Sequence, residues 1–78
     1  MKKRLTINEH VDIAARIENA SDAMKSILAY EEIFTKKESY RIGQTLTYAI
    51  GELKMRLKDE MAEDYGDAVA DETYGGAR

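Results

Sequence analysis

The sequence predicts an all-α protein, an antiparallel hairpin of two long helices that dimerises into a four-helix bundle. Three observations lead to this fold class. The chain has 78 residues and no proline that could break a long helix. Thr6 and Glu9, and again Thr35 and Glu38, are three residues apart, which is the spacing of a capping box at a helix start. Each pair precedes a stretch with helical apolar periodicity.

A short basic arm, residues 1–5, precedes the first helix, which is predicted to start after Thr6 and to end near Phe34. Its apolar residues form two stripes rotated relative to each other, Ile7, Val11, Ala14 and Ile17, then Ala20, Ala23, Met24, Ile27 and Leu28. One explanation is a break at residues 19–21, with Ser21 capping a new helix. The other is a whole helix whose halves touch different neighbours, which the helix-forming alanines favour.

The second helix is predicted to start after Thr35 and to run to about Tyr65, where Gly66 suits a left-handed cap. It carries one broad apolar stripe, Ile42, Leu46, Ala49, Ile50, Leu53, Leu57 and Met61. Because the connection is so short, the two helices must fold back antiparallel. Residues 6–66 therefore form the hairpin domain, and residues 67–78 are expected to be an acidic, frayed tail.

The apolar surface is larger than one hairpin can cover. Two helices bury only their shared seam, and a chain this short gains little stability from a single core. The chain has no cysteine, which excludes disulfides and thiolate metal sites, so a partner chain is the reinforcement that remains. We expect a homodimer in which the two hairpins complete a four-helix bundle.

The net charge of −3 conceals an uneven distribution. Residues 1–58 carry 11 basic and 8 acidic side chains, whereas residues 59–78 carry 7 acidic side chains and one arginine. In an antiparallel hairpin Lys2, Lys3 and Arg4 would face the acidic end of the second helix. The carboxylates there are Glu60, Glu63 and Asp64. Such exposed pairs contribute only ~0–1 kcal/mol each, so their expected role is to specify the antiparallel register.

Residues suited to catalysis or metal binding are scarce. His10 is the one histidine, and a lone histidine beside an apolar stripe is typical of a core or rim residue. The carboxylates near the helix ends lack the Glu-x-x-His motifs of dimetal bundles. No Gly-rich phosphate loop precedes a helix, and two helices hardly enclose a pocket. We therefore expect a protein that is not an enzyme and has no catalytic, cofactor or metal site.

Membrane segments are not expected either. The longest apolar run, residues 27–30, is far shorter than the ~20 residues of a membrane span or the ~7–15 of a signal-peptide core. The sequence therefore predicts a cytoplasmic protein that does not associate with membranes.

A second, narrower stripe on the second helix is the candidate protein-binding surface. It contains Gln44, Tyr48, Gly51, Met55 and Ala62. Aromatic residues and methionine are enriched at interfaces, and methionine adapts to irregular partners. The alternatives are that this stripe packs inside the dimer or that its residues are exposed singly. The acidic candidates for partner contact are Glu63, Asp64 and Asp67.

The leading functional hypothesis is an interaction protein that inhibits or bridges a larger protein machine. Cysteine-free chains of this size are common among phage and plasmid accessory proteins, a class that includes anti-host and anti-defence inhibitors. The alternative is an antitoxin-like or nucleic-acid-associated transcriptional regulator. Its acidic tail would fold onto a basic toxin, and Lys36, Lys37 and Arg41 would contact phosphates at a helix start. A third hypothesis is an assembly component that uses the first helix as an oligomer seam.

Overall fold

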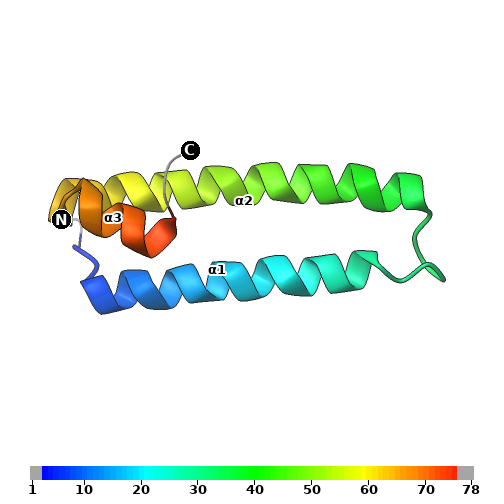
Figure 1. Cartoon of the computed structure of the whole chain (residues 1–78), viewed down its shortest axis with the longest axis horizontal. Coiled ribbons are helices and arrows are strands. Elements are labelled where there is room, and N and C mark those ends of the chain that lie inside the picture. The colour runs from blue at the N-terminus through cyan, green and yellow to red at the C-terminus, as the bar shows by residue number, and fades with distance from the viewer. Residues whose placement is uncertain (1–2, 76–78) are drawn as a thin grey trace.

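The computed structural model describes residues 3–75, which form three helices and no strand. These are α1 (Ile7–Leu28), α2 (Lys36–Tyr65) and α3 (Asp67–Tyr74). The two long helices run antiparallel along a molecule 45 Å in length, and α3 folds back at one end (Figure 1). The all-α class and the hairpin-like packing of α1 and α2 are confirmed. Within the described residues, no helix is both long and apolar enough to cross a membrane.

Both predicted helix starts are confirmed by reciprocal capping bonds. The Thr6 hydroxyl accepts from the Glu9 N–H at 3.1 Å, and the Glu9 carboxylate accepts from the Thr6 N–H at 2.8 Å. Thr35 and Glu38 repeat the arrangement at 3.1 and 3.0 Å. The backbone bond from Thr6 holds the pKa of the Glu9 carboxyl below its ordinary value. Each box satisfies backbone N–H groups that would otherwise lack a partner.

α1 is continuous through residues 19–21, which confirms the whole helix over the broken one. Its predicted end near Phe34 is wrong, because the helix ends at Leu28. The Ser39 hydroxyl of α2 donates to the Leu28 carbonyl at 2.6 Å and caps that end. Residues 29–35 then carry the chain to α2. This connection is longer than the sequence predicted, because the chain must cross the distance of about 8–10 Å between packed helix axes. Thr35 is also part of it, since a capping residue is extended and not helical.

α2 ends at Tyr65, as predicted, and Gly66 follows with φ 102° and ψ 156°. This is not the left-handed cap that the sequence suggested, because ψ is extended rather than helical. The single glycine redirects the chain, so that α3 begins directly at Asp67 and lies back along α2. Residues other than glycine adopt this backbone conformation only with strain.

We expect Gly66→Ala to lower the free energy of unfolding by about 1–3 kcal/mol, because alanine is strained at this φ. Gly51→Ala is the matched control inside α2, where an added Cβ would meet nothing within 4 Å. Alanine there should raise stability by roughly 0.5–1 kcal/mol. Urea unfolding followed by circular dichroism, at one protein concentration, measures both. Effects of the same sign would argue against strain at Gly66.

α3 corrects the expectation that the chain frays from residue 67 onward. Ala70 and Tyr74 are buried on its inner side, and Asp71 forms an ion pair with Lys58 of α2 at 2.9 Å. A helix this short is not stable alone, so its contacts with the long helices maintain it. The acidic composition of residues 67–78 indicates a tail, whereas Ala70 and Tyr74, four residues apart, form a short apolar face on a helix. The last part of the predicted tail, residues 76–78, lies outside the described residues.

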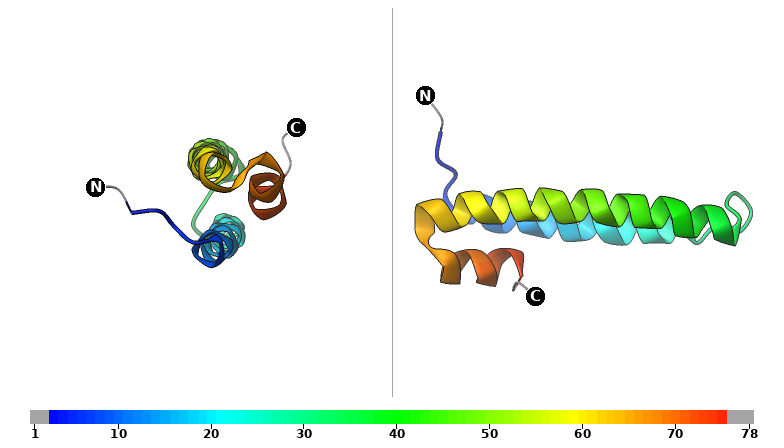
Figure 2. Two further views of the ribbon diagram at one scale, coloured as in Figure 1. Left: turned by 90° about the vertical axis from the view of Figure 1, so that its left-hand side faces the viewer. Right: turned by 90° about the horizontal axis from the view of Figure 1, so that it is seen from above.

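The hydrophobic core lies at the end of the molecule that α3 covers. Its buried residues are Ile17, Met61, Ala70 and Tyr74, together with His10. Figure 2 shows the three helices as a triangle when viewed end on, and α3 beside only one part of α2 when viewed from above. Beyond α3, toward the turn, α1 and α2 form a layer of two helices. This α1–α2 layer carries the candidate site.

Candidate protein-binding surfaces

His10 is buried in the core, where it joins α1 to α3. Its Nδ1 lies 2.7 Å from the Tyr74 hydroxyl oxygen, within a hydrogen bond. The rings of Tyr65 and Tyr74 pack edge-on against the imidazole, with centroids 6.3 and 5.6 Å away. The Tyr65 hydroxyl donates to the Leu5 carbonyl at 2.6 Å. These contacts give the histidine a structural role and enclose it away from a substrate.

The buried Tyr74 predicts a loss of stability in alkaline solution. Burial raises the pKa of its hydroxyl above the ordinary value of 10.0, so the unfolded chain releases this proton first. The protonated Tyr74 hydroxyl therefore makes its full contribution to the free energy of unfolding below pH 10. This contribution is lost as the pH rises from 10 through the folded-state pKa. Tyr74→Phe should remove this part of the pH dependence. Urea midpoints measured between neutral pH and pH 11 provide the comparison, and parallel curves would contradict the prediction.

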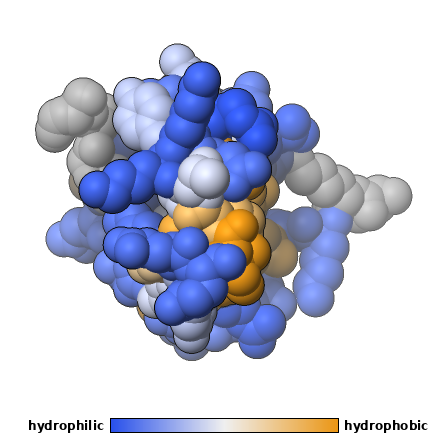
Figure 3. All heavy atoms as spheres, turned by 90° about the vertical axis from the view of Figure 1, so that its right-hand side faces the viewer, coloured by the Kyte–Doolittle hydropathy of each residue, from blue (hydrophilic) through white to orange (hydrophobic). Residues whose placement is uncertain are grey.

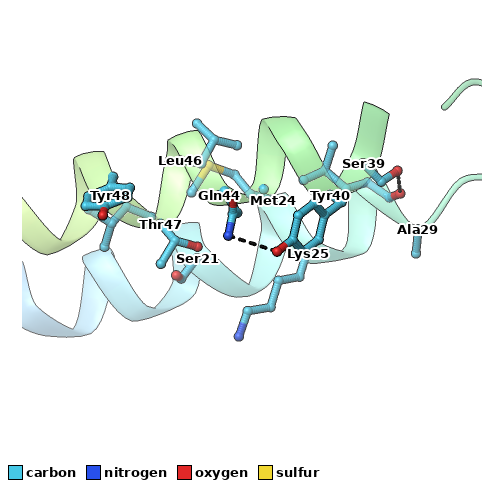
Figure 4. A pocket seen from close by; sticks show the side chains of 13 residues that line it. Ser21, Met24, Lys25, Ala29, Ser39, Tyr40, Gln44, Leu46, Thr47 and Tyr48 are labelled. Atoms are coloured by element: carbon cyan, nitrogen blue, oxygen red, sulfur yellow. Dashed lines mark hydrogen bonds between the residues drawn. The ribbon is translucent and has the colours of Figure 1, made fainter. Parts of the chain in front are cut away.

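An apolar groove runs along the α1–α2 layer toward the turn, with a volume of about 480 Å³ (Figure 4). Its main lining residues are Ser21, Met24, Lys25 and Leu28 of α1, and Tyr40, Gly43, Leu46, Thr47, Tyr48 and Ile50 of α2. Gly43 has no side chain to occupy the groove. A Cβ added there would contact Leu28 Cδ1 at 3.6 Å. Lys25 is the one charged side chain among its lining residues. The groove is thus an apolar surface with a single cation at its edge.

The predicted partner-binding stripe of α2 lies beside this groove. Tyr48 is 79% exposed and lines the groove, together with Gln44. Met55 is 66% exposed, and Gly51 has open space beside it. Ala62, at the far end of the stripe, packs against the core. Gln44 and Tyr48 therefore line the groove, whereas Gly51 and Met55 lie further along α2, outside it.

The predicted acidic contacts are divided between two environments. Asp64 is half-buried and lies 3.7 Å from the Arg4 side chain, measured between Oδ1 and Nε. Glu63 and Asp67 border a shallow hollow at the junction of α2 and α3. The structure thus brings Glu63 and Asp67 together, whereas Asp64 contacts the basic arm.

The basic arm was expected to pair with the acidic end of α2, and the Arg4–Asp64 contact confirms one such pair. The Arg4 guanidinium also lies 5.3 Å from the centroid of the Tyr65 ring. Lys3 lies 4.0 Å from the Glu9 carboxylate instead. Lys2 is outside the described residues. The arm therefore contacts both the start of α1 and the end of α2.

The turn end exposes apolar and basic side chains together. Ile33 is 69% exposed, and Figure 3 shows apolar atoms surrounded by polar ones at this end. Lys36, Lys37 and Arg41 are exposed nearby, at the start of α2. The described part of the basic arm, residues 3–5, lies at the opposite end of the molecule (Figure 1). A nucleic acid touching both basic groups would have to extend along the whole molecule.

A second apolar surface, here called the back face, lies on the side of the α1–α2 layer opposite α3. It consists of Ala20, Ala23 and Ile27 of α1, and Ile42, Ala49 and Leu53 of α2. Helical geometry turns these positions away from Lys25 and Lys58, which lie on the α3 side. Their separations of three, four and seven residues are those of a helix-packing seam. Ile27 and Leu53 are 53% and 50% exposed, so this seam is open.

Among residues 3–75, no three His, Asp or Glu side chains are grouped so that they could hold a metal ion. Comparison of the chain with protein-family models, curated proteins and solved structures finds no match. The chain's own surfaces therefore provide the evidence on its function.

Proposed function

We propose that this chain is a small helical interaction protein without catalytic activity, which acts as an inhibitor or adaptor of a larger protein machine. The observation that supports this most is the exposure of large apolar side chains on both faces of the α1–α2 layer. Extended apolar patches are rare on monomeric soluble proteins and commonly mark interaction sites. The enclosure of the single histidine in the core supports the non-enzymatic part of the proposal.

The protein acts as a homodimer through the back face. Its central alanines, Ala20, Ala23 and Ala49, allow close approach of a second α1–α2 layer, while Ile27 and Leu53 supply larger apolar contacts. Pairing two such layers produces a four-helix bundle with α3 on each outer side. The groove and the exposed stripe of α2 then remain free for a different partner.

We expect Leu53→Glu to convert the dimer to a monomer, because a carboxylate in the seam would be buried without a partner. Met55→Glu is the matched control, since Met55 lies on the same helix away from the back face and is 66% exposed. It should leave the dimer intact. Sedimentation equilibrium measures the mass of both variants. A wild-type chain that stays monomeric at every concentration would contradict the back-face dimer.

The partner is sought by capture from a host lysate followed by mass spectrometry, and the captured protein is then purified. Tyr48→Glu and Met55→Glu together should abolish its binding while leaving the dimer intact. If binding survives these changes and the dimer dissociates, the stripe is part of the dimer core. That result would assign the partner to another surface.

A further inference from the structure

α3 covers only part of the side of the α1–α2 layer on which it lies. The hollow at its C-terminal end is lined by Tyr74 and Gly75, and also by Ser21, Lys25 and Ile50 of the long helices. The last three residues line the apolar groove as well. The apolar groove therefore continues the α3 seat toward the turn, across a hollow that also holds the charged side chains of Glu18, Asp22, Lys54 and Glu72. The molecule fills the first part with its own helix and leaves the second part open (Figures 1 and 4).

We propose that the apolar groove receives an amphipathic helix of a partner protein, in line with α3, with an acidic side chain directed at Lys25. This inference rests on the proposed function, because it names the kind of partner segment that the interaction protein binds. Docking of an amphipathic helix into an apolar groove is a recurring mode of peptide recognition.

The way in which α3 packs on α1 and α2 shows which kind of helix this side of the layer accommodates. α3 contacts the same two helices with Ala70 and Tyr74 inward, while Asp71 at its edge pairs with Lys58 of α2 at 2.9 Å. The open part extends along α1 from Ser21 to Leu28. That length corresponds to about two helical turns at ~1.5 Å per residue. A guest helix of two turns would therefore fill the groove much as α3 fills the first part.

The charge at the groove also indicates an acidic guest. Lys25 is the one charged lining residue, and no acidic side chain pairs with it within residues 3–75. A carboxylate on the guest would reproduce the contact between Lys58 and Asp71. Tyr40 and Tyr48 are exposed at the groove and offer aromatic surface, which interfaces favour.

A second copy of the chain fits this groove poorly. The short helix that would have to enter it, α3, already buries its apolar residues Ala70 and Tyr74 against its own chain. Its apolar side is therefore not available to fill the groove of another copy. The back face remains the surface for self-association.

The test is a display library of helical peptides, each apolar along one face and carrying either Glu or Lys at the flanking positions, selected against the full chain. We expect peptides with acidic flanks to be enriched. Lys25→Glu should weaken the selected peptide by roughly tenfold or more, and a charge-reversed peptide should regain affinity for that variant. Thr47→Trp, which fills the groove, should abolish binding. Glu52→Trp is the control on α2, because Glu52 is exposed, lies outside the groove and is not part of the back face.

Three results would overturn the inference. The first is a selection that yields no binder, and the second is a binder unaffected by Thr47→Trp. The third is a Thr47→Trp variant that becomes monomeric, because the groove would then belong to the self-interface. Circular dichroism of each variant confirms that the helices are intact. If the captured natural partner still binds while no helical peptide enters the groove, the groove assignment fails and the proposed function stands.

Discussion

Replacing Tyr74 with alanine is expected to lower the free energy of unfolding by about 3–5 kcal/mol, the range for removing a buried aromatic side chain. Tyr74 anchors α3, and its hydroxyl is hydrogen-bonded to the buried His10. The substitution leaves a cavity and also a ring nitrogen without its partner. Since a chain this small has only ~3–5 kcal/mol from its core, α3 should detach and the variant should be marginally folded.

Urea unfolding at one protein concentration measures this effect, and two variants separate its causes. Tyr74→Phe keeps the ring and removes the hydroxyl, so it should cost about 1–3 kcal/mol. Tyr48→Ala removes the same side chain from an exposed position of α2 and should change stability by less than about 0.5 kcal/mol. Equal effects at positions 48 and 74 would mean that α3 does not pack as described.

The second large effect is expected at Met61, whose side chain is 0% exposed. Met61→Ala should lower the free energy of unfolding by about 2–5 kcal/mol, because it removes buried apolar surface and leaves a cavity between α2 and the core. Met55→Ala is the matched control, since both methionines lie on α2 and Met55 is 66% exposed. It should stay within about 0.5 kcal/mol of wild type.

A thermal melt of the two methionine variants gives an independent measurement. The midpoint should fall by many degrees for Met61→Ala, because a change of about 1 kcal/mol shifts a domain of this size by about 4–8 °C. A small shift for Met61→Ala would show that the core lies elsewhere. A large shift for Met55→Ala would show that its surface is covered by a second chain.

The two long helices could be predicted because their signals are local. Each capping box needs only a Thr and a Glu three residues apart, and Thr6, Glu9, Thr35 and Glu38 form the predicted bonds. The apolar stripe of α2 was also local, and Met61 within it is buried. The early end of α1 was missed because its cause is a distant contact, the bond from the Ser39 hydroxyl to the Leu28 carbonyl.

α3 was missed for a similar reason. Its eight residues are mostly acidic or small, and nothing in their own composition shows that Tyr74 finds His10 on another helix. The candidate site was predicted in part. Tyr48 was identified as a contact residue, but the groove beside it depends on how α1 and α2 are aligned. Met24 and Leu28 were therefore interpreted as ordinary packing residues.

The bonds that complete the core join the two ends of the chain. Tyr65 contacts Leu5 across 60 positions, and Tyr74 contacts His10 across 64. Contacts so remote in sequence form slowly, because a long loop must close first. During synthesis on the ribosome, both long helices would emerge before the segment that fastens them together. The α1–α2 pair is therefore fastened at this end only once α3 has also emerged and Tyr74 has reached His10.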